Sequence, residues 1–130
     1  AMLGEQVSLA VIDVSFISLG LVLGPVVGCL APGGRIVALV KPQFEAGRRH
    51  APRGVVRDPA VHRAVLERAL ATARSLGLVP LDVARSPLLG PAGNREFFAY
   101  LGLPDPAVPD GVPADARPDL AARVAECTAA

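Results

Sequence analysis

Four short apolar segments predict the strands of this chain. Residues 36–40 are aliphatic throughout, which is typical of a strand buried on both faces of a parallel sheet. Three further segments are rich in aliphatic or aromatic side chains and are bounded by turn-forming or charged residues: 7–12, 78–83 and 95–101.

Two longer stretches between these segments predict helices. Residues 59–76 carry their apolar side chains at helical spacing, with Asp58 as a cap before them and Gly77 after the last turn. A second, largely buried helix is expected over residues 16–31, capped by Ser15.

Strands that alternate with helices predict an α/β fold in which helices pack on a mainly parallel sheet. The domain itself is expected to span residues 1–103. Residues 104–118 contain five prolines and predict an irregular linker, and residues 119–128 predict a short terminal helix within the segment 104–130.

Charged residues stand at three strand ends. Asp13 follows segment 7–12, and Lys41 follows segment 36–40. Because ligands of open α/β sheets bind outside the carboxyl ends of the strands, both side chains are candidates for chemistry. Glu96 lies near the start of segment 95–101, and an antiparallel strand there would bring it to the same rim.

Each of the three charges also has a purely structural interpretation. Asp13 could cap the following helix, and Lys41 could be a surface lysine with a buried stem. Glu96 could pair on the surface with Arg95 or Arg85, an interaction that contributes little to stability.

Composition narrows the possible partners. A chain of 130 residues forms one domain at most, and its net charge of +1 gives no strong overall attraction for nucleic acid. The positive charge is local and gathers in one loop that could contact phosphates or could be a solvated surface: Arg48, Arg49, Arg53 and Arg57.

Two widely separated cysteines predict neither a disulfide framework nor a metal site, so no metal is expected and a reduced, cytoplasmic setting is the default. The apolar stretch 16–31 is short for a membrane span and is interrupted by glycines and a proline. We therefore expect no membrane partner.

Four motifs, in this order and spacing, resemble the TlyA family of bacterial rRNA 2′-O-methyltransferases, often named hemolysin A, whose catalytic domain is FtsJ-like. The motifs cover much of residues 5–102: DVSFISL at 13–19, LVKPQFEAG at 39–47, GVVRDP at 54–59, and SP at 86–87 followed by GPAGNREF at 90–97.

The resemblance implies a Rossmann-like, FtsJ-type sheet with one antiparallel strand, and S-adenosylmethionine as methyl donor. FtsJ-like enzymes use a Lys-Asp-Lys-Glu tetrad, of which the last three members match Asp13, Lys41 and Glu96 as catalytic residues. The first lysine has no counterpart, and no G-x-G-x-x-G loop occurs in these 130 residues. The chain thus resembles the carboxyl half of such a domain.

The family also implies roles for residues beside the tetrad. Asp13, Ser15 and Phe16 would border the methyl donor, whereas Asn94 and the arginine loop would contact ribosomal RNA, alone or in ribosomal subunits. Two other functions remain open. The first is a non-catalytic fragment that self-associates as a homodimer through the exposed edge of segment 7–14. The second is a membrane-active hemolysin, which needs an amphipathic, lysine-rich or spanning helix that the sequence lacks.

Overall fold

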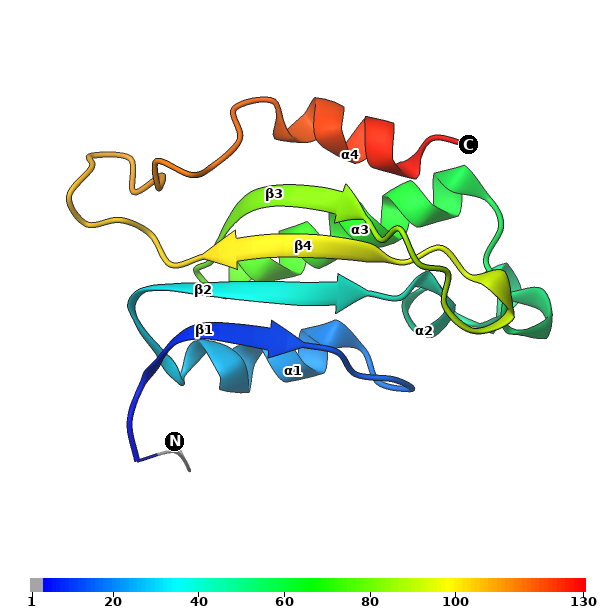
Figure 1. Ribbon diagram of the computed structural model, residues 1–130, viewed down its shortest axis with the longest axis horizontal. Helices are drawn as coiled ribbons and strands as arrows, with labels where there is room; N and C mark the ends of the chain where they lie inside the picture. Colours follow the sequence, from blue (N-terminus) through cyan, green and yellow to red (C-terminus); the bar gives the residue numbers. More distant parts are fainter. Residues whose placement is uncertain (1–3) are drawn as a thin grey trace.

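Four strands form one mixed sheet in the computed structural model, which describes residues 4–130 (Figure 1). The order across the sheet is β1 (Val7–Ile12), β2 (Leu30–Val40), β4 (Phe97–Gly102) and β3 (Val79–Arg85). Strand β2 runs parallel to β1, and β4 runs antiparallel to both its neighbours. Three strands therefore point the same way and one is reversed, which confirms the predicted fold class. Residues 1–3 of the expected domain lie outside the described residues.

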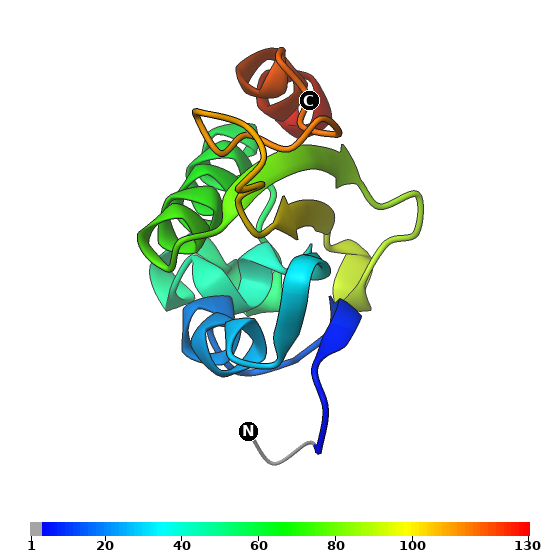
Figure 2. The same cartoon turned by 90° about the vertical axis from the view of Figure 1, so that its left-hand side faces the viewer.

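Helices α1 (Leu19–Val27) and α3 (Pro59–Ser75) cover one face of this sheet (Figure 2). Between the two layers lies the core, to which both helices and all four strands contribute buried apolar side chains. Along β2, for example, Ile36, Ala38 and Val40 are fully buried, whereas the alternate residues are only half-buried. Alternation of this kind puts every second side chain on the helix-covered face.

Helix α3 has the signals that the sequence predicts. Asp58 caps it by accepting a hydrogen bond from the Ala60 N–H at 2.9 Å, and Pro59 occupies the first helical position. Gly77 follows the last turn with a φ of 84°, a left-handed conformation that glycine adopts without a steric penalty.

Helix α1 is shorter than predicted. It begins at Leu19 rather than near Phe16, because Phe16 has a φ of 64° and cannot continue a right-handed helix. Ser18, not Ser15, is the cap, accepting a hydrogen bond from the Gly20 N–H at 3.3 Å. The helix ends at Val27 because the chain already enters β2 at Leu30, which pairs with β1.

Gly33 and Gly34 lie inside β2, ahead of its aliphatic residues. Pairing with β1 runs from Val7–Leu30 to Leu9–Arg35, so β2 contains three extra residues between these two pairs. Gly33 takes up this irregularity with a φ of 75°. The regular part of β2 is therefore the aliphatic segment that the sequence analysis identified.

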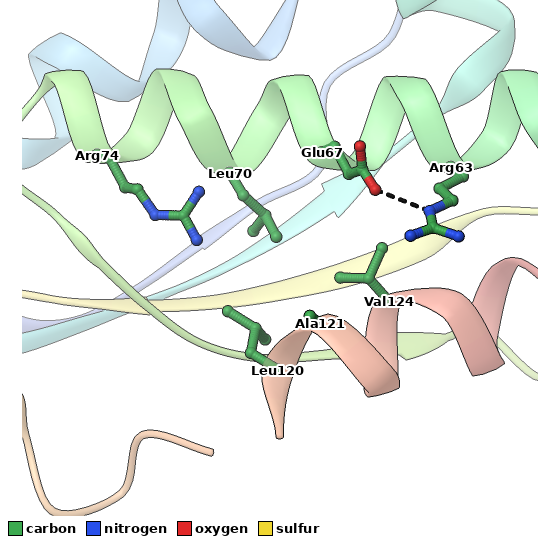
Figure 3. Close-up of a pocket in the computed structure, with 7 residues that line it drawn as sticks. All are labelled: Arg63, Glu67, Leu70, Arg74, Leu120, Ala121 and Val124. Atoms are coloured by element: carbon green, nitrogen blue, oxygen red, sulfur yellow. Dashed lines mark hydrogen bonds and ion pairs between the residues drawn. The ribbon is translucent and has the colours of Figure 1, made fainter. Parts of the chain in front are cut away.

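Helix α4 (Leu120–Thr128) lies beside β3 and α3 (Figure 1). A cavity of about 310 Å³ separates α3 from α4, and Figure 3 shows Leu70 of α3 and Leu120 and Val124 of α4 beside it. Arg123 of α4 also forms an ion pair with Asp82 of β3, at 2.6 Å. The tail beyond residue 103 thus packs against the domain.

The linker that leads to α4 is irregular, as predicted, but it is tied to the sheet. The Asp115 carboxylate accepts two hydrogen bonds from Arg35, at 2.9 and 3.0 Å, and one from the Tyr100 hydroxyl at 2.9 Å. Further along, the Arg117 N–H donates to the Leu81 carbonyl of β3 at 2.8 Å. The linker therefore spans strands β2, β4 and β3.

These contacts predict a pH-dependent contribution of Asp115 to stability. The hydrogen bonds from Arg35 hold the pKa of Asp115 below its ordinary value. A lowered folded-state pKa stabilises the fold above the unfolded pKa of about 3.9, and this stabilisation is lost as the pH falls through the folded value. We expect Asp115→Asn to lower the free energy of unfolding at pH 7 by less than about 1 kcal/mol, because the pair is partly exposed.

Chemical denaturation at pH 7 and below pH 4 measures this effect. The difference in free energy of unfolding between the unmodified protein and Asp115→Asn should be smaller at the lower pH. Asp110→Asn is the control, since its oxygen accepts only from the nearby Val112 N–H and an amide oxygen can do the same. A difference that does not change with pH would contradict the assignment.

Candidate active site

The predicted charged residues lie together at one rim of the sheet. Each of these three residues is the chain neighbour of a buried strand residue whose side chain faces the helices: Asp13 of Ile12, Lys41 of Val40, and Glu96 of Phe97. Because side chains alternate along a strand, the three charged side chains point to the opposite face. Val40 pairs with Phe97 in the antiparallel ladder, and extending this register by one residue sets Lys41 opposite Glu96. The sequence therefore predicted their position correctly.

Lys41 makes the central ion pair of this rim. Its Nζ lies 2.6 Å from Oδ1 of Asp13 and donates to the Ser15 hydroxyl oxygen at 3.2 Å. The lysine side chain is 12% exposed and the Asp13 side chain 63% exposed. The ammonium group is thus largely enclosed by protein, while its counter-ion faces solvent.

Glu96 is buried, and its carboxylate is not ion-paired with Lys41 but has a different partner. Its Oε2 accepts a hydrogen bond from the Gln43 side-chain amide at 2.8 Å. Gly90 packs directly against the same carboxylate, since a Cβ atom at this position would lie 2.1 Å from Oε2. Arg85, one of the expected surface partners of Glu96, donates instead to backbone carbonyls near the end of α4.

Two phenylalanine rings pack against each other at a tilt on the solvent side of the rim. The Phe16 and Phe44 rings have centroids 4.7 Å apart, and Phe16 is 89% exposed. Phe16 also has the left-handed backbone conformation that ends the extended chain before α1. A bulky residue held in this conformation is strained by about 1–3 kcal/mol. Such strain at an exposed aromatic residue is typical of a binding surface.

Glu45, the last residue of the short helix α2 (Pro42–Glu45) that follows Lys41, contacts the start of helix α1. Its carboxylate accepts hydrogen bonds from the Leu19 N–H at 2.7 Å and from the Ser18 hydroxyl at 3.1 Å. An acidic group at a helix N-terminus accepts hydrogen bonds from free backbone N–H groups, and its negative charge interacts favourably with the helix dipole. Its own carbonyl accepts from Arg68 of α3 at 2.6 Å. Sequence reasoning missed this role, because the pairing spans 26 residues and has no local pattern.

The arginine loop lies next along the chain and is exposed. All four of its arginines are exposed to solvent: Arg48, Arg49, Arg53 and Arg57. The loop is nevertheless anchored, because Val55 and Val56 are buried and the His62 ring nitrogen pairs with the Val56 carbonyl at 2.8 Å. The loop therefore exposes positively charged side chains while its backbone is anchored to the domain.

Asn94 supplies the other anchor and is itself buried, at 1% exposure. Its amide nitrogen donates to the Gly54 and Pro91 carbonyls, each at 2.8 Å, and its oxygen accepts from the Val56 N–H at 3.0 Å. The structure thus places Asn94 between the arginine loop and the turn before β4, in this conformation out of reach of RNA.

A separate apolar area lies beside the rim, on β1 and the helix-free face. Leu9 is 55% exposed and Val11 71% exposed, and their strand pairs on one side, with β2. An apolar groove of about 460 Å³ lies between β1 and α1, lined mainly by residues such as Ala10, Leu21 and Val26. Exposed apolar surface on an edge strand is a favourable place for another chain to pair.

Residues 4–130 contain neither a candidate metal cluster nor a candidate membrane-spanning helix. Within this range, no cluster of three or more histidine, cysteine or acidic side chains is placed to hold a metal ion. Among the helices of the same range, none is both long enough and apolar enough to cross a membrane.

Similarity to known proteins identifies the protein family to which this chain belongs. Residues 1–103 match the FtsJ-like methyltransferase family, and the chain belongs to it. Among individual proteins, it is 47% identical over 96 residues to YqxC of Bacillus subtilis, which carries a provisional rRNA methyltransferase name. It is 45% identical over 100 residues to the 16S/23S rRNA (cytidine-2′-O)-methyltransferase TlyA of Mycobacterium tuberculosis. The expected resemblance to TlyA is therefore confirmed.

A solved structure agrees with these sequence matches. A protein of Streptococcus thermophilus, described provisionally as a hemolysin, superposes with a TM-score of 0.77 and 40% identity over 95% of this chain and 43% of its own. The matches cover 73% and 76% of this chain but only 34% of YqxC and 37% of TlyA. The chain thus spans about a third of the length of these curated relatives.

The environment of Asn94 leads to a test of its structural importance. Asn94→Leu keeps the side-chain size but leaves the Val56 N–H and two carbonyls without their partner. Each buried polar group left unpaired costs about 1–3 kcal/mol, so we expect a large fall in the free energy of unfolding by denaturant titration. Arg95→Leu, at the exposed neighbouring position, should change it little. Equal stability of the two variants would contradict the anchoring role.

Proposed function

We propose that this protein acts in the S-adenosylmethionine-dependent methylation of ribose 2′-hydroxyl groups in ribosomal RNA. The observation that carries the proposal is the rim itself. Asp13 and Lys41 form an ion pair and Glu96 lies opposite the lysine, at the carboxyl ends of parallel strands in an FtsJ-like fold. The name and identity of TlyA support the reaction and the RNA substrate.

Lys41 is the residue best placed to act on the hydroxyl. A ribose hydroxyl is a weak nucleophile, so its proton must be accepted or its oxygen oriented as the new bond forms. A charged lysine orients the oxygen by donating an N–H, and a neutral lysine accepts the proton. In either role Asp13 would position the amine through its ion pair, and Glu96 would act on it from the facing strand.

Side chains of the same rim fit one end of the methyl donor. Asp13 and Ser15 offer polar oxygens, and Phe16 offers an exposed ring beside them. When bound, S-adenosylmethionine supplies an electrophilic methyl group on a sulfonium. We place Asp13, Ser15 and Phe16 along its methionine portion.

The arginine loop is the proposed RNA-binding surface. Arg48, Arg49, Arg53 and Arg57 would contact phosphates, which gives affinity that falls with salt and carries no sequence information. Asn94 would contribute by holding this loop on the domain. Ribosomal RNA or ribosomal subunits are the partners, and the reaction would take place in the cytoplasm.

We further propose that residues 1–103 correspond to the carboxyl half of the catalytic domain, with residues 104–130 as linker and terminal helix. The sequence has no glycine-rich donor loop and no match to the first lysine of the tetrad. Coverage of about a third of TlyA is consistent with this division. The chain alone would then be weakly active or inactive, and the missing elements would restore activity.

The test of the proposed function is transfer of a labelled methyl group to ribosomal subunits by the protein with its catalytic domain complete. The 2′-O-methylated nucleotide is located by mass spectrometry. Lys41→Ala should lower the rate by about 10²–10⁴-fold, the range typical for loss of a positioned acid or base. The fold should persist, because Asp13 remains solvated when its partner is removed. Thermal unfolding checks that point.

Arg74→Ala is the matched control, since it removes an exposed positive charge on α3 away from the rim (Figure 3). Titration of S-adenosylmethionine into both variants separates donor binding from chemistry. Turnover by Lys41→Ala close to that of the unmodified protein would remove Lys41 from the mechanism.

A second proposal concerns assembly. We propose that two copies pair through the open edge of β1, because Leu9 and Val11 expose apolar surface there and β2 occupies only the other side of the strand. This function as a self-associating module does not exclude catalysis.

Sedimentation at micromolar concentration should show a dimer. Val11→Lys should give a monomer, because it sets a charge in the apolar contact. Leu88→Lys is the control, since Leu88 is similarly exposed, at 76%, but lies in the loop after β3. An unmodified chain that sediments as a monomer would rule out the proposal.

A further inference from the structure

The side-chain amide of Gln43 has a hydrogen-bond partner for its nitrogen but none for its buried oxygen. Its amide nitrogen donates to Oε2 of Glu96 at 2.8 Å. Its amide oxygen is buried and, among the side chains of residues 4–130, is the one buried polar atom without a hydrogen-bond partner. Buried polar groups are almost always paired, so an unpaired acceptor calls for an explanation.

Asn94 shows what a purely structural amide looks like in the same protein. Both its nitrogen and its oxygen are fully used, by three backbone groups. Gln43 makes one bond only, and that bond goes to a candidate catalytic carboxylate rather than to the backbone. The two amides therefore differ in what they stabilise.

Glu96 is confined between Gln43 and Gly90. Gln43 follows Lys41 by two residues, at the start of the short helix α2 (Pro42–Glu45). Gly90 approaches the same oxygen and leaves no room for a Cβ atom beside Oε2. The carboxylate is therefore held by both contacts, on the residue that the extended register of β2 and β4 sets opposite Lys41.

We propose that Gln43 is a positioning residue for methyl transfer, which holds the Glu96 carboxylate in place beside Lys41 and is retained at a cost in stability. The proposal rests on the function proposed above. Gln43 itself need not touch substrate, because it acts through Glu96. The unpaired oxygen is the consequence of using the amide for this one contact.

Gln43→Leu tests the proposal because leucine has a similar size and no polar atoms. It removes the bond to Glu96 and also the unpaired buried acceptor, two changes with opposite effects on stability. We expect the melting temperature to change by less than about 3 °C. We expect kcat to fall on the order of 10- to 100-fold, as for a displaced catalytic group, with the RNA KM within about twofold.

Gly90→Ala displaces the same carboxylate by a different contact, because the added Cβ atom would lie 2.1 Å from Oε2. Gly90 has a φ of −79°, so alanine meets no backbone penalty there and acts only through its methyl group. This variant should show the same loss of kcat with RNA KM kept. Asn94→Leu is the structural control and should lower the melting temperature much more than Gln43→Leu.

The outcomes separate this inference from the function on which it rests. Normal kcat in both Gln43→Leu and Gly90→Ala, in an active protein, would overturn the role of Gln43 alone. A melting temperature for Gln43→Leu as low as that of Asn94→Leu would assign Gln43 to the fold instead. Absence of methyl transfer by the unmodified protein, with its catalytic domain complete, would overturn the proposed function and this role together.

Discussion

The pairing of β2 on both sides is the constraint on which the rim depends. The parallel register with β1 ends at Ile12 and Ala38 and delivers Asp13 and Ser15 to Lys41, and the antiparallel register with β4, extended by one residue, sets Glu96 level with it. A shift by one residue in either ladder would turn one of the charged side chains into the core. Burial of Ile36, Ala38 and Val40 against the helices therefore determines where the charges lie.

The residues after β2 then connect this rim to the remaining motifs. Lys41 pairs with Asp13, Gln43 with Glu96, Phe44 with Phe16, and Glu45 with the start of α1. Four side chains in one short segment thus reach two separate parts of the chain, residues 13–19 and Glu96. The spacing of the motifs in the sequence reflects these contacts, since each partner must arrive at the same end of the sheet.

The sequence predicted what depends on local pattern. The aliphatic run of β2 and the caps of α3 needed only neighbouring residues, and the convergence of Asp13, Lys41 and Glu96 followed from strand direction. It could not predict that Phe16 adopts a left-handed conformation or that Asn94 is fully buried, because both depend on contacts between segments distant in the chain. The docking of Asp115 on Arg35, 80 residues away, is likewise invisible to periodicity.

The two edge strands of the sheet differ in how far the chain itself covers them, and this difference affects how many copies of the protein could assemble. Beside β3, the linker and α4 contribute a backbone hydrogen bond at Leu81 and an ion pair at Asp82, whereas β1 is paired with β2 on one side and exposes Val11. A sheet with two free edge strands can add further chains at both edges without limit. Two copies that pair symmetrically through the same edge strand leave no such edge free in either copy. Covering of β3 by the chain's own tail therefore favours a closed pair over a growing fibre.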